Sequence, residues 1–313
     1  MEFKHISVLL NETIEGLKIK PNGIYVDCTL GGGGHSLEIA KKLKNGRLIC
    51  IDQDIEAIEA AKIKLSDYIE NITFVKSNFK YFCEILDELE IDKVDGILMD
   101  IGVSSHQIDK EDRGFSYIHN SELDMRMDQS QELTAKYIVN NYSGEELTNI
   151  FYKYGEEKWS KRIAEFIVEK RKDKEIRTTF DLVEIVDKAV PVEVRRKSKG
   201  HYSKRVFQAL RIEVNNELGV LEEVLPKMVD CLNLGGRLCV ITFHSLEDRI
   251  VKNIFKDLNT SCICPPEIPI CVCNKKKKIK IISRKPIVPS QEEMEQNPRS
   301  KSAKLRVVER VRD

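Results

Sequence analysis

Residues 24–36 read IYVDCTLGGGGHS, and this stretch decides the fold. The apolar run at its start combines β-branched and aromatic side chains, which predicts a buried strand. The four glycines that follow, Gly31 to Gly34, predict a tight turn, and residues 36–43 have the composition of a helix. Because glycine lacks a Cβ atom and the first N–H groups of a helix lack partners within it, a ligand can approach such a turn closely. The order strand, glycine turn, helix therefore predicts an α/β sheet with a nucleotide-like cofactor at its first turn.

The spacing of the acidic residues and glycines indicates which cofactor this is. A dinucleotide-binding turn needs the pattern G-x-G-x-x-G, and the third glycine of that pattern would fall on Ser36. Asp27 ends the first strand, where a carboxylate suits a ligand with a cationic amino-acid end and no pyrophosphate. A second strand, residues 47–51, leads into Asp52, 19 residues after Gly33, where a carboxylate can accept hydrogen bonds from both ribose hydroxyls. We therefore predict S-adenosylmethionine, with a nicotinamide cofactor or an ordinary turn with a capping aspartate as alternatives.

Composition narrows the class of protein. The chain has 313 residues, enough for one large or two modest cores, and its 51 basic and 51 acidic residues leave no net charge. Binding to a polyanion must then depend on local basic patches, which occur at residues 195–205 and 275–285. No run has the length of a membrane span or the pattern of a signal peptide, and the cysteine count is nine, an odd number. These features predict a cytoplasmic protein with reduced thiols that does not act at a membrane.

Two further strands place candidate residues at the same edge of the sheet. A third strand precedes Phe79, which can either stack on a flat base or pack against the helix that follows. The fourth strand, residues 94–99, ends at Asp100, and the loops after parallel strands line one crevice in a doubly wound sheet. Asp100, Ser104 and Gln107 are therefore candidates for the reaction centre, with a loop capped by an aspartate as the alternative.

The alternation of strands and helices then stops. Apolar residues recur at intervals of three and four over the next hundred residues, which predicts helices. We expect an inserted all-helical domain at residues 109–204, between the two halves of a cofactor-binding domain at residues 1–108 and 205–313.

A loop at residues 112–128 precedes the predicted helices. It holds Arg113 and Arg126 together with Phe115 and Tyr117. Aromatic rings beside guanidinium groups suit unpaired bases and phosphates, so the loop is a candidate RNA contact. A surface loop packed by its own side chains explains the same residues equally well.

The sheet is predicted to resume after the insertion. Apolar residues at steps of three and four predict one long helix from residue 210 to residue 228. Leu-Gly-Gly at residues 234–236 predicts a turn, and a strand follows at residues 237–242. Short strands at residues 280–282 and 304–311 are expected to close the edge of the sheet.

Four cysteines form two C-x-C pairs near the end of the chain: Cys262, Cys264, Cys271 and Cys273. Four thiols within twelve residues are enough for a tetrahedral zinc site. However, the usual zinc knuckle is C-x-x-C, and the loop between the two pairs is short. The spacing therefore favours an apolar or redox-sensitive loop over a structural zinc site.

Many blocks of the sequence resemble one family, the MraW methyltransferases of ribosomal RNA. The resemblance extends from residue 5 to the C-terminal region and is carried by the blocks DCTLGGGGHS, ICIDQD, GILMDIGVSSHQID, RGFSY, LDMRMD, YGEEKWSKRIA, RVFQALRIEVNNEL, GGRLCVITFHSLEDRIVK and NPRSKSAKLRVVER. It implies a class I methyltransferase fold and transfer of a methyl group from S-adenosylmethionine to N4 of a cytidine in the decoding region of small-subunit (16S) ribosomal RNA. It also implies that the helical insertion helps to recognise that RNA, within an assembled or assembling 30S subunit.

Carried onto matching positions, the cofactor contacts of the family fall on Gly33, Gly34, His35, Asp52, Phe79, Asp100 and Gln107. The resemblance adds His35 and favours stacking for Phe79. It does not extend to the cysteine pairs or to the lysines after them, and it leaves the oligomeric state open, a homodimer included.

The group that accepts the proton of the cytosine amine is the least determined part of the site. Amino-methyltransferases often carry an Asp/Asn/Ser-Pro-Pro-aromatic motif after the fourth strand, whereas this chain has Asp-Ile-Gly-Val-Ser at residues 100–104. The catalytic candidates are Asp100, Ser104 and His244, which follows the strand at residues 237–242. A serine hydrolase is not predicted, because no G-x-S-x-G turn accompanies His244. A methyltransferase with another substrate, or an RNA-binding protein that does not use its cofactor pocket, are the alternative functions.

Overall fold

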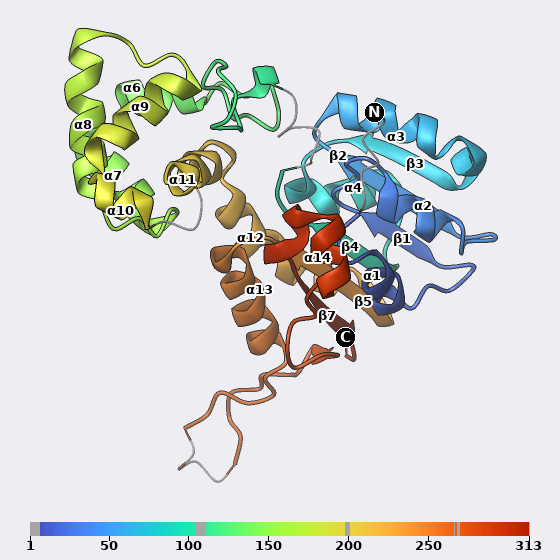
Figure 1. Cartoon of the computed structure of the whole chain (residues 1–313). Helices are drawn as coiled ribbons and strands as arrows, with labels where there is room; N and C mark the ends of the chain where they lie inside the picture. Colours follow the sequence, from blue (N-terminus) through green and yellow to red (C-terminus); the bar gives the residue numbers. More distant parts are fainter. Residues whose placement is uncertain (1–6, 104–110, 198–200, 266, 268–269, 313) are drawn as a thin grey trace. The chain divides into compact units, whose positions relative to one another are not determined.

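A seven-stranded sheet organises the computed structural model, which describes residues 7–103, 111–197, 201–265, 267 and 270–312 (Figure 1). The strand order is β3-β2-β1-β4-β5-β7-β6. The first five strands run parallel, and β7 runs antiparallel to both β5 and β6. Their bounds are β1 Ile24–Asp27, β2 Arg47–Asp52, β3 Ile72–Lys76, β4 Val94–Asp100, β5 Leu232–Thr242, β6 Ile279–Ile281 and β7 Lys304–Arg310.

Helices connect the strands and cover the sheet. Their bounds are α1 Leu10–Leu17, α2 Gly34–Ala40, α3 Ile55–Lys64, α4 Phe82–Glu88, α12 Glu217–Asp230, α13 Ser245–Leu258 and α14 Gln291–Gln296. Short 3-10 helices occupy Ser66–Asn71, Phe79–Tyr81 and Pro298–Ser302. None of the described helices combines the length and the apolar content that crossing a membrane requires.

The sheet is buried on both faces, because side chains alternate along each strand. In β5, Leu238 and Val240 belong to a core that includes residues of α4, α12 and α13. Their neighbours Cys239 and Ile241 belong to a second core that includes residues of α1, α2 and α3. Helices thus cover both faces of a mainly parallel sheet, and the predicted class I methyltransferase fold, a doubly wound α/β sheet, is confirmed.

The chain divides into two compact units. Residues 1–102 and 218–313 form the sheet unit, and residues 103–217 form the helical unit. The sequence analysis placed these boundaries after residues 108 and 204. The second boundary lies later because helix α11, Lys204–Asn215, buries Phe207 and Leu210 in the core of the helical unit.

The helical unit contains α6 Ala135–Asn141, α7 Gly144–Lys153, α8 Ser160–Asp173, α9 Thr179–Ala189, α10 Val192–Arg196 and α11, besides a 3-10 turn at Glu111–Arg113 and one isolated β-bridge. Local sequence explains where two of these helices begin. Ser143 caps α7 and Thr178 caps α9, each in a capping box with an acidic residue three positions later.

Two local predictions were wrong. The predicted long helix is two helices, because Asn216 adopts a left-handed conformation (φ 47°) and ends α11 before α12 begins. The predicted turn at Leu234 lies within β5, where the pairing with β4 shifts between Val94 and Gly96 and Gly235 has φ 77°. The glycines therefore form a bulge in a continuous strand and not a turn between two elements.

Candidate cofactor site at the carboxyl ends of the strands

Asp27, at the end of β1, holds the turn that follows this strand through hydrogen bonds. It is buried, and its two carboxylate oxygens accept hydrogen bonds from Ser36 Oγ (2.7 Å) and the Thr29 N–H (3.1 Å). Burial raises the pKa of this carboxyl, and the hydrogen bonds oppose that shift. The sequence analysis placed Asp27 next to a cationic ligand. Its direct partners in the structure are groups of the turn itself, so it acts on a ligand through its charge.

The glycine turn is held closely against neighbouring elements. Gly31 and Gly33 have φ of 47° and 68°, which side chains rarely tolerate. A Cβ atom at Gly33 would lie 3.2 Å from Ala61 Cβ, and one at Gly34 would lie 1.9 Å from Ser7 Oγ. Crowding by Ala61 and Ser7 inside the protein therefore favours glycine at positions 33 and 34, a reason that the sequence analysis did not consider.

Asp52, at the end of β2, is oriented by the backbone. Its Oδ2 accepts a hydrogen bond from the Gly31 N–H (2.8 Å), and its Oδ1 accepts one from the Asp54 N–H (2.9 Å). Burial raises the pKa of Asp52 to about 6, against the opposing effect of these two bonds. Each oxygen keeps a free lone pair, so the carboxylate can accept two further hydrogen bonds from a diol.

Phe79 follows β3 in a short 3-10 helix. Asn78 caps this helix, and its side-chain amide donates to Gln53 Oε1 (2.8 Å), which joins the loops after β2 and β3. The Phe79 ring is half-buried and packs against the core on the α4 side of the sheet. The ring is therefore held in place by the core while part of it stays accessible.

His35 and Asp100 connect two elements of the site: the start of α2 and the end of β4. His35 is 5% exposed, with Nε2 3.0 Å from the carbonyl oxygen of Val8 and Nδ1 3.7 Å from Asp100 Oδ2. The backbone N–H of Asp100 donates to Thr29 Oγ1 (2.6 Å). The glycine turn and the end of β4 are thus parts of one site.

Asp100 is the most perturbed carboxyl of this site. Its Oδ1 atom is buried and has no hydrogen-bond partner among the described residues. Burial raises its pKa to about 8, and the negative charges of Asp27 and Glu247 add to that shift. In the absence of a ligand, Asp100 is therefore mostly protonated at neutral pH.

Glu247 is a site residue that the sequence analysis missed. It is fully buried at the start of α13, and its Oε2 accepts hydrogen bonds from the N–H groups of Phe243 (2.8 Å) and His244 (3.1 Å). The signal was present in the order His-Ser-Leu-Glu, since an acidic residue three positions after a helix cap is the mark of a capping box.

His244 is engaged in the same cap. Its Nδ1 accepts a hydrogen bond from the Glu247 N–H (3.4 Å), and its Nε2 lies 3.0 Å from Glu247 Oε1. Nε2 and Oε1 have no hydrogen-bond partner among the described residues despite this distance, so the bond at Nδ1 is what favours a structural role for His244. Ser104 and Gln107, the remaining predicted residues, lie outside the described residues.

In the helical unit, the loop at residues 112–128 uses its charged groups internally. The Arg113 guanidinium is 3% exposed and donates to the carbonyls of Arg126 (3.0 Å) and Met127 (3.2 Å). Arg126 in turn pairs with both oxygens of Asp124 (2.8 Å each).

The aromatic rings of the loop at residues 112–128 also contact protein groups. Tyr117 stacks on His201 (4.7 Å between ring centres) and meets Phe207 edge-on, while Phe115 packs against the core of the unit. Of the two interpretations of this loop, the structure favours packing by its own side chains.

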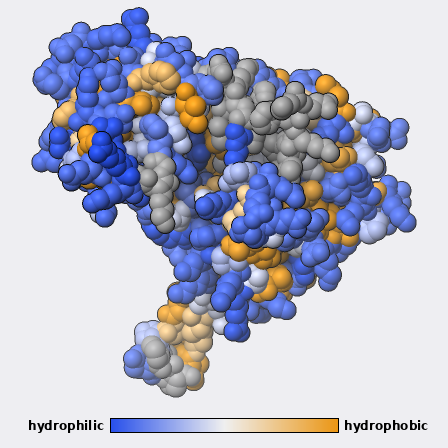
Figure 2. Space-filling model, in the orientation of Figure 1, coloured by the Kyte–Doolittle hydropathy of each residue, from blue (hydrophilic) through white to orange (hydrophobic). Residues whose placement is uncertain are grey.

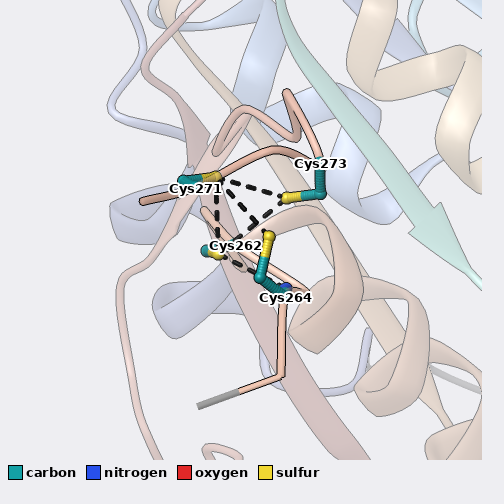
Figure 3. A group of neighbouring side chains, drawn as sticks. All are labelled: Cys262, Cys264, Cys271 and Cys273. Atoms are coloured by element: carbon teal, nitrogen blue, oxygen red, sulfur yellow. Dashed lines mark hydrogen bonds between the residues drawn. The ribbon is translucent and has the colours of Figure 1, made fainter. Parts of the chain in front are cut away.

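The four cysteines named above come together outside the cofactor site. They lie on the loop between α13 and β6, and Figure 3 shows their sulfur atoms pointing toward one another.

Comparison with known proteins gives a match over the whole chain. Residues 2–311 match the model of the MraW methylase family. A protein of Finegoldia magna is 60% identical over 99% of this chain and 100% of its own length, and one of Clostridioides difficile is 56% identical over the same shares. Both carry the name ribosomal RNA small subunit methyltransferase H. Among solved structures, an rRNA methylase from Streptococcus thermophilus aligns over 98% of this chain and 99% of its own, with 11% identity and a TM-score of 0.44, a likeness too distant to carry an inference.

Proposed function

The chain belongs to the MraW methylase family, and on that premise we propose that it transfers a methyl group from S-adenosylmethionine to N4 of a cytidine in the decoding region of small-subunit (16S) ribosomal RNA. Relatives that match nearly the full chain are named as methyltransferases of that RNA. The observation that carries the proposal is the group of buried carboxyls around Asp100, at the edge where the loops after β1, β2 and β4 meet. An RNA substrate of this kind would place the protein with ribosomes in the cytoplasm.

The carboxyls fit a cofactor with a net positive charge. The negative charges of Asp27 and Glu247 disfavour ionisation of Asp100, and the imidazole of His35 lies 3.7 Å from Asp100 Oδ2. S-adenosylmethionine carries a sulfonium and an ammonium group against one carboxylate. A positive charge beside Asp100 favours its ionised form, so the site is more stable with such a ligand than without it.

Each proposed cofactor residue has a distinct part in binding. Asp52 would accept the ribose hydroxyls with the two lone pairs that its backbone partners leave free. Phe79 would stack on the adenine base, since its ring is held by the core and stays partly accessible. The backbone at Gly33 and Gly34, the His35 ring and Gln107 complete the set that family membership proposes.

The chemistry of the amine determines what Asp100 must do. When bound, S-adenosylmethionine supplies the methyl group and the positive charge on sulfur that makes it transferable. The N4 amine of cytosine is a poor nucleophile because its lone pair is delocalised into the ring. An ionised Asp100 would accept a hydrogen bond from the amine, which localises the lone pair, and would then take the proton that the amine loses. Ser104 is the alternative acceptor, and His244 is the weakest of the three because of its place in the α13 cap.

In the helical unit, we propose that exposed basic residues contact the RNA. Arg196, Lys197, Lys204 and Arg205 are exposed, whereas the arginines of the loop at residues 112–128 bind protein groups. Exposed lysines and arginines neutralise phosphates without selecting a particular base sequence, which suits a folded RNA inside a ribosomal subunit.

The test is transfer of labelled methyl to small ribosomal subunits from a strain that lacks this protein, followed by nucleoside analysis of the RNA. We expect the label in N4-methylated cytidine and its loss in Asp100→Asn. Asp95→Asn is the matched control, because Asp95 lies on the same strand but pairs with Lys20 (2.8 Å) at the opposite end. Label in another nucleoside would contradict the N4 assignment, and cofactor binding without any transfer would favour a non-catalytic role in subunit assembly.

A further inference from the structure

The described residues of the loop between α13 and β6 form no apolar core that could hold it in shape. In Figure 1 it extends away from the body of the sheet unit, and Figure 2 shows apolar residues along it. Ile263, Ile270 and Val272 are 64%, 75% and 68% exposed. Burial of apolar surface therefore does not explain why the two cysteine-bearing segments of this loop, residues 262–264 and 271–273, lie together.

What lies at the centre of the loop is a group of four sulfur atoms (Figure 3). The Sγ of Cys271 lies 3.5 Å from those of Cys262 and Cys273 and 3.9 Å from that of Cys264, and Cys262 and Cys273 are 3.9 Å apart. All four sulfurs lie within 4.8 Å of one another. A tetrahedron of thiolates around zinc, with Zn–S bonds of about 2.3 Å, has sulfurs about 3.8 Å apart. The observed separations match that value and are far longer than the roughly 2.05 Å of a disulfide.

Backbone N–H groups also point at these sulfurs. The Ile263 N–H donates to Cys273 Sγ (3.4 Å), the Cys264 N–H to Cys262 Sγ (3.4 Å), and the Val272 N–H to Cys264 Sγ (3.3 Å). Hydrogen bonds to sulfur spread the negative charge of a thiolate, and bound thiolates are the form that a metal requires. Both C-x-C pairs thus take part, and in two of the three bonds the donor and the sulfur belong to opposite segments of the loop.

From this geometry we propose that Cys262, Cys264, Cys271 and Cys273 bind one Zn²⁺ ion as a structural tetrathiolate site. Four protein ligands close the coordination sphere and leave no position for a substrate, so the ion holds the loop and takes no part in methyl transfer. A zinc ion with four thiolates carries a net charge of −2. The lysine run Lys275 to Lys278 follows after Asn274; its first and last members pair with Asp257 and Asp230, and Lys276 and Lys277 are positioned to offset the charge. The sequence analysis disfavoured zinc because of the C-x-C spacing, and the convergence of the sulfurs reverses that preference.

The chain provides its own control in a second thiol pair. The Sγ atoms of Cys83 and Cys231 lie 3.8 Å apart in the sheet unit, but neither residue belongs to a group of potential metal ligands among the described residues. Two thiols do not make a closed zinc site. A serine at Cys83 therefore removes one thiol of a close pair without touching the proposed ligands.

The experiment measures the metal content of the full chain, purified without chelators or added metal, by mass spectrometry of the elements. We expect one zinc per chain in the wild type and in Cys83→Ser, and at most a small fraction of that in Cys271→Ser. Cobalt(II) exchanged into the wild type should give the visible absorption of a tetrahedral tetrathiolate complex, which Cys271→Ser should lack. Because the loop is peripheral, far-UV circular dichroism should show that both variants are folded.

A second measurement does not depend on any variant. Removal of the ion from the wild type by a strong chelator should release four thiols to a thiol reagent and speed tryptic cleavage at Lys275 to Lys278, and added zinc should reverse both effects. Purified protein with no zinc, with iron in its place, with disulfides between these cysteines, or with all four thiols reactive before chelation would overturn the proposal.

Discussion

Buried charge in the two units differs most clearly at Asp100. In the helical unit Arg113 binds backbone carbonyls, and Arg211 forms a two-pronged pair with Glu217 (2.8 and 2.9 Å). Buried Glu157 also has one oxygen, Oε2, without a hydrogen-bond partner among the described residues, but its Oε1 accepts bonds from the Tyr202 hydroxyl (2.6 Å) and the Trp159 N–H (2.8 Å). In the sheet unit, Asp100 has a buried oxygen without a partner, and its pKa is raised to about 8. The charged groups of the helical unit thus bind other groups of that unit. In the sheet unit, burial disfavours the ionised form of Asp100, and a cationic ligand would favour that form again.

The sharpest test of this difference is Asp100→Asn. Loss of the proposed proton acceptor should lower methyl transfer by about 100-fold or more. The same change should stabilise the protein. The folded pKa of about 8 lies above the unfolded value of 3.8, so stability falls as pH rises between these values, and an amide escapes that loss. We expect the melting temperature at pH 8 to rise by at least about 2 °C, measured by calorimetry.

Asp95→Asn, on the same strand as Asp100, should change the melting temperature in the opposite direction. Although burial acts to raise the pKa of Asp95, hydrogen bonds from Lys20 and the Ile24 N–H outweigh it and lower the pKa. Its stabilising contribution is present above the unfolded pKa, so the amide should lower the melting temperature at neutral pH. If Asp100→Asn lowered it as well, or left transfer unchanged, the contrast between paired and unpaired carboxyls would not hold.

The next largest effect is expected from Arg113→Met in the helical unit. The change leaves the buried carbonyls of Arg126 and Met127 without their donor and should cost about 2 kcal/mol or more in the free energy of unfolding. Trp159 is the single tryptophan of the chain and lies in the helical unit, so its fluorescence in urea reports on this unit alone.

Affinity for S-adenosylmethionine should be unchanged in Arg113→Met below the unfolding transition. The exposed Arg196→Met is the control and should shift the free energy by no more than about 0.5 kcal/mol. A fall in cofactor affinity without unfolding would show that the buried charges of the helical unit also serve the cofactor.

A smaller effect is expected from Asp52→Asn. The single amide nitrogen of the asparagine would face the backbone N–H of Gly31 or of Asp54, and a charged acceptor for the ribose hydroxyls would be lost. Affinity for S-adenosylmethionine should fall about tenfold or more by calorimetric titration, with no comparable change in Asp67→Asn, where the carboxyl is exposed. Equal affinity in the two variants would remove Asp52 from the cofactor site.

The smallest effect is a release of protons on cofactor binding. At pH 7 the free protein holds a proton on Asp100, because its pKa is about 8, and a cation beside it lowers that pKa. Binding should therefore release up to about one proton. The affinity for S-adenosylmethionine should then rise with pH, by less than tenfold per pH unit between about pH 6 and 8. Titration calorimetry in two buffers of different ionisation enthalpy measures the release, which should nearly vanish in Asp100→Asn. Proton uptake would contradict the proposed charge relation.

Much of the fold was predictable from local pattern. The strands that end at Asp27, Asp52 and Asp100 are short apolar runs, each followed by a loop, and the structure ends β1, β2 and β4 at those residues. The edge strands β6 and β7 were also predicted to within two residues. Strand ends are readable because apolar runs and acidic residues are local features of the sequence.

Other features depend on tertiary contacts and could not be read in this way. The break at Asn216 was missed because the apolar period continues in phase from α11 into α12. The partners of Arg113, and the Ser7 hydroxyl that excludes a side chain at Gly34, lie elsewhere in the chain. The convergence of the four cysteines was likewise hidden, because spacing alone does not give the path of the loop between them.

The place where the helical unit enters the chain has an evolutionary consequence. The chain leaves the sheet unit after residue 102, just past β4, and returns at residue 218, before the strand that pairs with β4. Every pair of named strands lies within the sheet unit, so segment 103–217 interrupts none of them. An ancestral gene could have gained this segment in a single insertion within one strand-helix-strand connection, keeping its cofactor chemistry while it acquired a new substrate.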